Sequence, residues 1–151
     1  MGKKVHPPNT RDNANKWKPP LIRDNVPTKW NWVCHHHQHL TLKELVDIGA
    51  FTYINAKHGV TIEENVQIGS HCSIYSISTI DGKKGEVVLR RNARIGSHTV
   101  IMPNVTIGEN SIIGAFSFVN KDVPSNVLAY GIPVNVIREL NEAEMMVSRI
   151  E

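Results

Sequence analysis

The chain has 151 residues, of which 40% are hydrophobic and 21% charged, and its formal net charge at pH 7 is +3. This length and composition are typical of one soluble domain, and no apolar run is long enough to span a bilayer. The positive charge is small and scattered, which argues against a nucleic-acid partner. The lysines near the N-terminus are not followed by an apolar segment, so we expect a cytoplasmic protein with Cys34 and Cys72 reduced.

Residues 1–32 are expected to form an irregular N-terminal arm. They are rich in Pro, Asn, Lys and Arg and show neither helical nor strand periodicity. Trp17, Trp30 and Trp32 lie in this arm, and exposed indole rings are unfavourable unless they dock on another surface. Two interpretations stay open: an arm that packs on a surface, and a flexible leader.

Four histidines follow the arm, in the run His35-His36-His37-Gln38-His39. Imidazole is a common zinc ligand, so this run is a candidate metal site. The contiguous spacing is more typical of a strand that enters the domain with alternate histidines exposed. We therefore predict a plain strand here and no metal.

From Leu42 onward the sequence repeats every six residues. Each of twelve hexads begins with an aliphatic residue: Leu42, Ile48, Ile54, Ile62, Ile68, Ile74, Leu89, Ile95, Ile101, Ile107, Ile113 and Val119. The fifth position is small or aliphatic: Val46, Thr52, Val66, Cys72, Ser78, Ala93, Thr99, Val105, Ser111, Ser117 and Val123. The two positions lie two residues apart across each hexad junction, so both side chains point to one face of a short strand.

A six-residue period, with this density of Gly, Asn, Ser and Pro, predicts short strands joined by corners and not helices. Successive hexads must then stack into a solenoid whose interior is a ladder of aliphatic side chains. Asn65, Asn92 and Asn110 recur at one corner, where a structural ladder of amides is expected. The stretch 80–88, IDGKKGEVV, interrupts the repeat and is predicted to be an external loop. Periodicity leaves the hand of the coil open.

The segment IGSHTVIMPNVTIGENSIIGAFSFVNKDVPSNVLAYGIPVNVIREL resembles the closing half of the hexapeptide-repeat acyltransferases, which include sugar O- and N-acetyltransferases. The resemblance covers about residues 42–140. It implies an all-β fold, a left-handed parallel β-helix of about four coils that occupies 33–136, and a homotrimer with active sites between subunits. The last residues, 137–151, place Ile137, Leu140, Val147 and Ile150 at near-helical spacing, which predicts a short C-terminal helix.

The same resemblance implies that acetyl-CoA is the co-substrate. Ser97 and Ala115 match small corner residues along which the pantetheine arm of CoA runs. Asn120 and Lys121 match residues that contact its adenosine and phosphate end. Arg138 matches an arginine that pairs with the nucleotide phosphates.

Acyl transfer to a hydroxyl or an amine needs a base, and a neutral imidazole suits that role. We take His71 as the first candidate and His98 as the second. In the galactoside and maltose enzymes of the family the catalytic histidine stands on the projecting loop, but the corresponding residues 78–81 contain none. Either a histidine elsewhere serves as the base, or the acceptor is an amine that needs less help.

For the acceptor, Asn55 matches a sugar-binding asparagine of the family, and Tyr75 and Asp81 border the loop. We therefore expect N-acetylation of an amino sugar, nucleotide-linked and destined for a surface polysaccharide such as lipopolysaccharide. Two alternatives stay open. One is O-acetylation of a sugar hydroxyl, and the other is a zinc enzyme like the γ-class carbonic anhydrases, which share the same prism.

Overall fold

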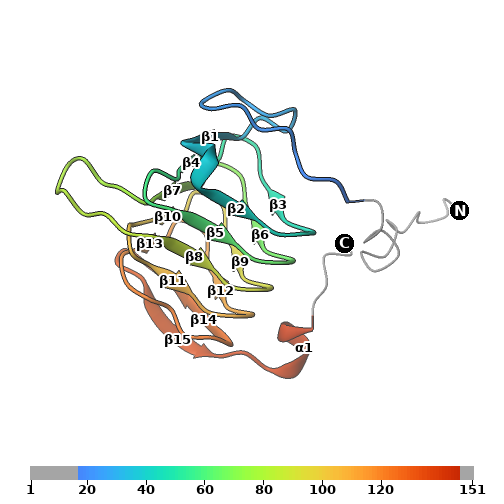
Figure 1. Ribbon diagram of the computed structural model, residues 1–151. Coiled ribbons are helices and arrows are strands. Elements are labelled where there is room, and N and C mark those ends of the chain that lie inside the picture. The colour runs from blue at the N-terminus through green and yellow to red at the C-terminus, as the bar shows by residue number, and fades with distance from the viewer. Residues whose placement is uncertain (1–16, 147–151) are drawn as a thin grey trace, which may run out of the picture.

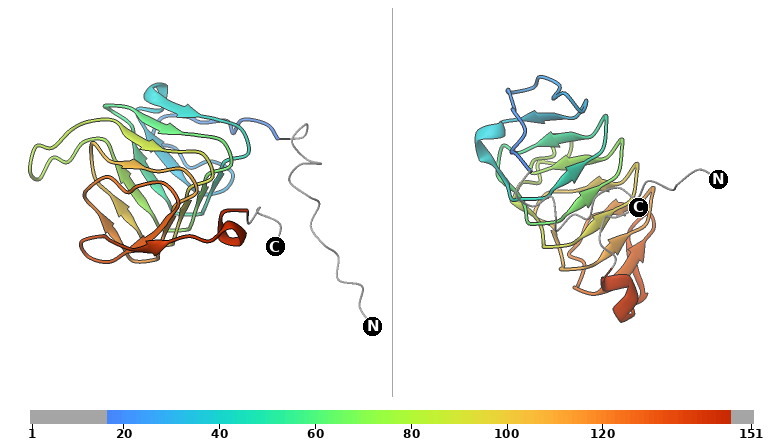
Figure 2. Two further views of the ribbon diagram at one scale, coloured as in Figure 1. Left: turned by 90° about the horizontal axis from the view of Figure 1, so that it is seen from below. Right: turned by 90° about the vertical axis from the view of Figure 1, so that its right-hand side faces the viewer.

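The computed structural model describes residues 17–146 of the chain. The first 16 residues of the expected arm and the last five of the expected C-terminal helix lie outside this range. Within it, short strands and corners wind into a stack of coils with three sides, followed by one short helix, α1 (Glu142–Met145) (Figure 1). Residues 17–32 lie at one end of the stack and α1 at the other, as the right-hand view of Figure 2 shows.

Each side of the stack is one sheet of parallel strands, except that the last strand of the third sheet is antiparallel. The first sheet has the order β1-β4-β7-β10-β13, with bounds Val33–His35, Tyr53–Asn55, Ser73–Tyr75, Val100–Ile101 and Phe118–Val119. The second contains β2 (Leu40–Leu42), β5 (Val60–Ile62), β8 (Val87–Leu89) and β11 (Thr106–Ile107). The third contains β3 (Asp47–Ile48), β6 (Gln67–Ile68), β9 (Arg94–Ile95), β12 (Ile112–Ile113), β14 (Val127–Tyr130) and β15 (Asn135–Glu139).

These strands make about five coils, one more than the repeat predicts. The strands that the twelve hexads do not include lie at the two ends of the stack: β1 precedes the first hexad, and β14 follows the last. Strand β1 pairs in parallel with β4, so that Cys34 lies beside Ile54 and both are fully buried. The repeat does not reveal β1 because a cysteine, and not an aliphatic residue, stands at its inward position. The predicted fold class, a parallel β-helix, is confirmed.

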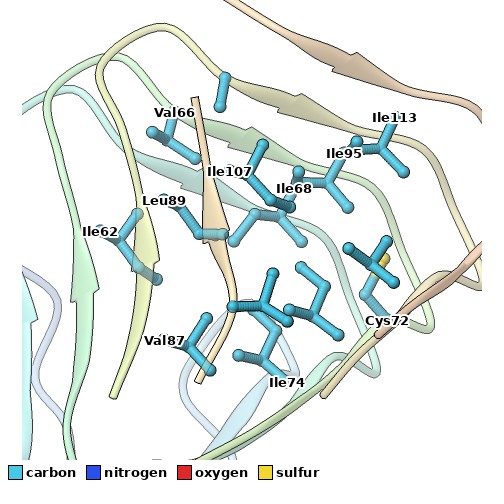
Figure 3. Close-up of a cluster of buried hydrophobic side chains, with 14 of the residues drawn as sticks. Ile62, Val66, Ile68, Cys72, Ile74, Val87, Leu89, Ile95, Ile107 and Ile113 are labelled. Carbon is cyan, nitrogen blue, oxygen red and sulfur yellow. The ribbon is translucent and has the colours of Figure 1, made fainter. Parts of the chain in front are cut away.

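The core is the ladder of side chains that the hexads predict. Ten of them are labelled in Figure 3 and point into the space between the three sheets: Ile62, Val66, Ile68, Cys72, Ile74, Val87, Leu89, Ile95, Ile107 and Ile113. Full burial of each aliphatic side chain stabilises the fold by about 1.5–3 kcal/mol before the entropy cost. Buried hydroxyls at fifth positions are also satisfied, because Thr52 Oγ1 donates to the Gly69 carbonyl over 3.1 Å.

The corner between the second and third sheets is held by the expected ladder of asparagine amides. Asn65, Asn92, Asn110 and Asn126 all adopt the left-handed backbone, with φ between 59° and 64°. Asn65 Nδ2 donates to Asn92 Oδ1 over 2.9 Å, and the bond repeats from Asn92 to Asn110 and from Asn110 to Asn126, each at 2.8 Å. Asparagine tolerates this backbone, and its amide can donate and accept at once. The structure therefore extends the predicted ladder by one residue.

Three local predictions need correction. The histidine run is not a plain strand, because β1 ends at His35 and residues 37–39 form a short 3₁₀ turn after a left-handed His36. The external loop was predicted at residues 80–88, but in the structure it begins and ends earlier in the chain. Ile77 and Lys84 form an antiparallel bridge at its base, and Val87 is buried in β8, because Val87 and Leu89 both point inward. Ser78, expected inside, lies in this loop.

The C-terminal helix is also shorter than expected. Residues 137–139 belong to β15, which pairs antiparallel with β14 and satisfies the backbone of that edge strand. The helix starts only at Glu142, after Asn141 and Glu144 form a reciprocal capping box. Neither α1 nor any other helix within residues 17–146 has the length and apolarity needed to cross a bilayer.

Candidate functional site

A pocket of about 520 Å³ lies where the first sheet meets the loop between β7 and β8. The loop stands out from the coils in Figure 1 and in the left-hand view of Figure 2. Strands β4 and β7 supply Tyr53, Asn55 and Tyr75, and Met102 directly follows β10. The loop supplies Ile77, Ser78, Thr79, Ile80 and Asp81. All three residues assigned from sequence to the acceptor, Asn55, Tyr75 and Asp81, are therefore brought together.

The strand side of this pocket is an ordered column of side chains. His35, Asn55 and Tyr75 are register partners on β1, β4 and β7, and their outward direction follows from the inward Cys34 and Ile54 beside them. Asn55 Oδ1 accepts a hydrogen bond from the Lys57 amide over 3.2 Å. This bond fixes the side chain and leaves its NH₂ group to donate to a ligand.

Two aromatic rings form the wall of the pocket. Tyr53 and Tyr75 lie with their ring centroids 5.8 Å apart and their planes inclined by 49°. Tyr53 and Met102 are pocket residues that were not predicted from sequence. The hexad pattern describes only the inward positions, so it did not point to these outward residues.

On the loop side, Asp81 supplies a fixed negative charge. A hydrogen bond from the Ser78 hydroxyl and another from the Lys83 amide lower the pKa of the Asp81 carboxyl, so it is ionised at neutral pH. Lys83 Nζ lies 3.2 Å from Asp81 Oδ2 and partly neutralises it. The pocket thus combines one carboxylate, one amide and two phenol rings, a set that suits a polar ring-shaped ligand.

Both predicted catalytic histidines lie elsewhere, at the corner between the third and first sheets. Residues 49–51, 69–71, 96–98 and 114–116 stack there and begin with glycine, and we call them the glycine corner. A Cβ atom on Gly96 would lie 2.4 Å from the Ala115 amide nitrogen, so the coils approach too closely for any side chain. His71 lies four residues before the pocket residue Tyr75, which corresponds to about 13 Å of extended chain. Neither His71 nor His98 lines the pocket.

The third residues of the glycine corner form one continuous stack of rings, Phe51–His71–His98–Phe116. Their successive centroid distances are 5.1, 4.7 and 4.8 Å. All four residues are exposed and adopt positive φ values. The stack accounts for both histidines without assigning them a reaction, since each imidazole has a ring on either face.

Small residues of the glycine corner border a groove of about 410 Å³ on the third sheet. Gly69, Gly96 and Ser97 line it, together with Gln67 and Arg94. Ala115 is exposed one coil further along. The glycines let successive coils pack backbone against backbone, so only small residues border the groove.

The residues expected at the nucleotide end of CoA are separated. Asn120 and Lys121 are exposed just after β13, at the edge of the first sheet opposite the glycine corner. Arg138 lies on β15 and is already paired, since its two terminal nitrogens donate to the Glu144 carboxylate over 2.9 and 2.6 Å. A phosphate at Arg138 would have to compete with this carboxylate. Among residues 17–146, no group of three His, Cys, Asp or Glu side chains is arranged to hold a metal ion.

Residues 86–121 match the family model described as bacterial transferase hexapeptide (six repeats). Over 94 residues the chain is 44% identical to a galactoside O-acetyltransferase of Escherichia coli strain K12, an alignment that covers 56% of this chain and 46% of the relative. The chain is therefore similar to the hexapeptide-repeat acetyltransferases. This hexapeptide-repeat protein spans about half the length of the curated relatives it matches.

Two solved structures share the fold of this hexapeptide-repeat protein. A galactoside acetyltransferase in complex with coenzyme A has a TM-score of 0.70 and 30% identity, and covers 82% of this chain and 66% of its own. A hexapeptide-repeat acetyltransferase from Vibrio cholerae O1 biovar eltor, complexed with acetyl coenzyme A, has a TM-score of 0.70 and 27% identity. That match covers 74% of this chain and 66% of the other.

Proposed function

We propose that this hexapeptide-repeat protein is an acetyltransferase that transfers the acetyl group of acetyl-CoA to a sugar. The pocket beneath the loop carries the proposal, because it unites Asn55, Tyr75 and Asp81 from two strands and a loop. Its aromatic wall and few hydrogen-bonding groups suit a sugar ring, whose faces are apolar and whose edges are polar. The similar structures that hold CoA or acetyl-CoA support the co-substrate.

Within this reaction we assign an amino sugar as the acceptor, and therefore N-acetylation. The support is the Asp81 carboxylate, whose lowered pKa keeps it charged at neutral pH and so favours an ammonium group. We further assign a nucleotide-linked amino sugar, made in the cytoplasm for a surface polysaccharide. This finer part rests on the resemblance to sugar acetyltransferases.

For acetyl-CoA, the roles assigned from sequence become part of the proposal. Ser97 and Ala115 would lie along the pantetheine arm, where their small side chains fit. Asn120 and Lys121 would contact the nucleotide end. Lys121 has no ion-pair partner within the described residues, so its charge is available to a phosphate. Arg138 fits this role less well, because Glu144 already occupies its guanidinium.

O-Acetylation of a hydroxyl is the second candidate, and the E. coli relative, named a galactoside O-acetyltransferase, favours it. The two are separated by incubating the protein with acetyl-CoA and a panel of paired sugars, free and nucleotide-linked. The members of each pair differ only in an amino or a hydroxyl group, and the release of free CoA thiol is followed. Release with the amino members supports the proposal, and release only with the hydroxy members moves the function to O-acetylation. If no member of the panel gives release, the proposal is overturned.

We also propose that the working unit is a homotrimer with its sites between subunits. The support is geometric: Ser97 and Ala115 lie at one edge of the first sheet, whereas Asn55, Asn120 and Lys121 lie at the other. Four to five residues of extended chain, about 13–16 Å, separate the two edges. A single chain therefore does not place its small-residue groove beside its own pocket. Two copies side by side would do so.

The trimer is tested by mass and by complementation. Light scattering should give three times the 16.9 kDa of one chain. Ser97→Trp and Asn55→Ala should each be inactive alone, but subunits mixed in equal amounts should recover about a quarter of the sites, those that combine two intact halves. A monomer by light scattering, or a mixture without any recovered activity, would contradict a shared site.

A further inference from the structure

The acceptor pocket needs a base, and neither His71 nor His98 lines it. The column of outward side chains that runs through the pocket holds another imidazole. In that column His35 is the register partner of Asn55, one strand away, or about 4.8 Å between backbones. His35 is not itself among the residues that line the pocket, but its side chain projects from the same face of the sheet as that of Asn55, which does line it.

A carboxylate stands beside this imidazole. Asp24 Oδ2 lies 3.7 Å from His35 Nε2, and Asp24 belongs to the segment that caps the first coil. The other oxygen, Oδ1, accepts a hydrogen bond from the His37 amide at 3.0 Å and lies 3.3 Å from His37 Nδ1. These bonds fix the carboxylate. They also lower the pKa of Asp24, so it is ionised when an imidazole near it takes up a proton.

The other histidines of the run contact other groups. The ring of His36 stacks on His35 at a centroid distance of 4.1 Å. Burial, and then the charge of His35, lower the pKa of His36. His39 Nδ1 is engaged with the Lys57 carbonyl at 3.0 Å. Asp24 is the acidic group facing His35, and the charges of Lys57 and His39 act on the neighbouring His36.

We propose that His35 is the general base for the acceptor, with Asp24 as its positioning residue. The inference rests on the proposed function. Asp24 holds the Nε2–H tautomer, so Nδ1 takes the proton from the acceptor nitrogen or oxygen as that atom forms a bond to the acetyl carbon. The carbon–sulfur bond then breaks, the electron pair leaves on sulfur, and the proton passes from His35 to the thiolate. The products are the acetylated sugar and CoA with a free thiol.

The distance of 3.7 Å is longer than a hydrogen bond, and such contacts shorten in complexes with substrate. The sequence contains no pattern that reveals this pair, because Asp24 and His35 come from an irregular arm and a histidine run. Only the folding of the arm over the first coil brings them together. The pair would give residues 17–32 a direct part in catalysis.

The inference is tested with His35→Gln, Asp24→Asn and a control, His39→Gln, which removes a histidine of the same run. We expect His35→Gln to lower kcat about 100-fold, with an unchanged KM for acetyl-CoA and loss of the acidic limb of the pH profile. Asp24→Asn should lower kcat about tenfold and shift that limb. The control should stay within twofold of the wild type.

Two readouts guard against a purely structural effect. Added imidazole should restore part of the activity of His35→Ala, which a misfolded variant would not show. The NMR chemical shifts of the His35 ring should also change in Asp24→Asn, in the absence of any substrate, because the carboxylate lies 3.7 Å from Nε2. If the wild type releases thiol but His35→Gln stays within threefold of it, the base lies elsewhere and the proposed function stands. If the wild type releases none with any paired sugar, the proposed function itself fails.

Discussion

The imidazole rings of His71 and His98 lie one coil apart and stack face to face, with centroids 4.7 Å apart and planes only 7° from parallel. Phe51 and Phe116 continue the stack on either side. The spacing matches the rise of one coil of the β-helix, so identical corners place planar side chains against one another. At the glycine corner, the ring side chains therefore repeat from coil to coil as regularly as the backbone does.

We expect this stack to stabilise the fold measurably. His71→Asn and His98→Asn keep a residue that tolerates positive φ but remove a ring, and each should lower the free energy of unfolding by about 0.5–1.5 kcal/mol for every ring–ring interaction that it removes. In the double variant the combined effect should fall short of additive by about 0.5–1 kcal/mol, because the two rings share one stacking interaction. Urea denaturation of the four proteins measures this, and strict additivity would show that the stacking carries no energy.

The asparagine ladder predicts a larger effect at its centre than at its end. Asn92 makes two amide bonds within the ladder and donates to the Met145 carbonyl as well, whereas Asn126 makes one ladder bond. Asn92→Ala should cost about 2–4 kcal/mol, from the missing hydrogen bonds and from the left-handed backbone. Asn92→Gly isolates the amide bonds, because glycine adopts that backbone freely. Equal destabilisation by Asn92→Ala and Asn126→Ala in denaturation would contradict the ladder.

We expect the Arg138–Glu144 pair to stabilise the C-terminal segment in a pH-dependent way. The Arg138 guanidinium, and then the Asn141 amide, lower the pKa of Glu144 from 4.5 to about 2. A folded-state pKa below the unfolded one means that the pair stabilises the fold above pH 4.5 and loses this contribution as the pH falls towards 2. Glu144→Gln should therefore melt below the wild type at pH 7, with a difference that closes between pH 4.5 and 2.

Its matched control is Glu139→Gln, whose side chain is on the neighbouring strand position and outside the pair. Melting curves by circular dichroism across the pH range give the comparison. A gap between Glu144→Gln and the wild type that stays constant down to about pH 2 would mean that the pair contributes nothing through its charge.

The two cysteines should resist thiol reagents while the protein is folded. Burial, and then the charge of Asp24, raise the pKa of Cys34 to about 12, and burial also raises the pKa of Cys72. Only the thiolate reacts, so neither residue should be labelled at about pH 8 until denaturant unfolds the chain. Mass spectrometry after iodoacetamide counts the labels. Labelling of Cys34 in the native state would show that the first coil opens.

The sequence by itself determined the solenoid, because its inward positions are set by local spacing. Ile48, Ile68 and Ile95 recur six residues from their neighbours, and no fold other than a stack of coils buries them all at that spacing. The asparagine ladder could be predicted for the same reason, because residues at equivalent positions of successive coils lie above one another. Tyr75 and Asp81 were predicted because they border one recognisable interruption of the repeat, and Asn55 was predicted from the resemblance to a sugar-binding asparagine.

Tertiary structure decided what periodicity does not encode. Strand β1 carries the inward Cys34 outside the recognisable hexads, and the loop ends at Val87 because an inward valine joins β8. Strand β15 forms where a helix was expected. It pairs antiparallel with the open edge of β14, and this edge exists only once the coils have stacked. His71 and His98 stack on each other, while Asp24 meets His35 through the path of an irregular arm. Such contacts between unrelated segments depend on three-dimensional packing, which local spacing does not specify.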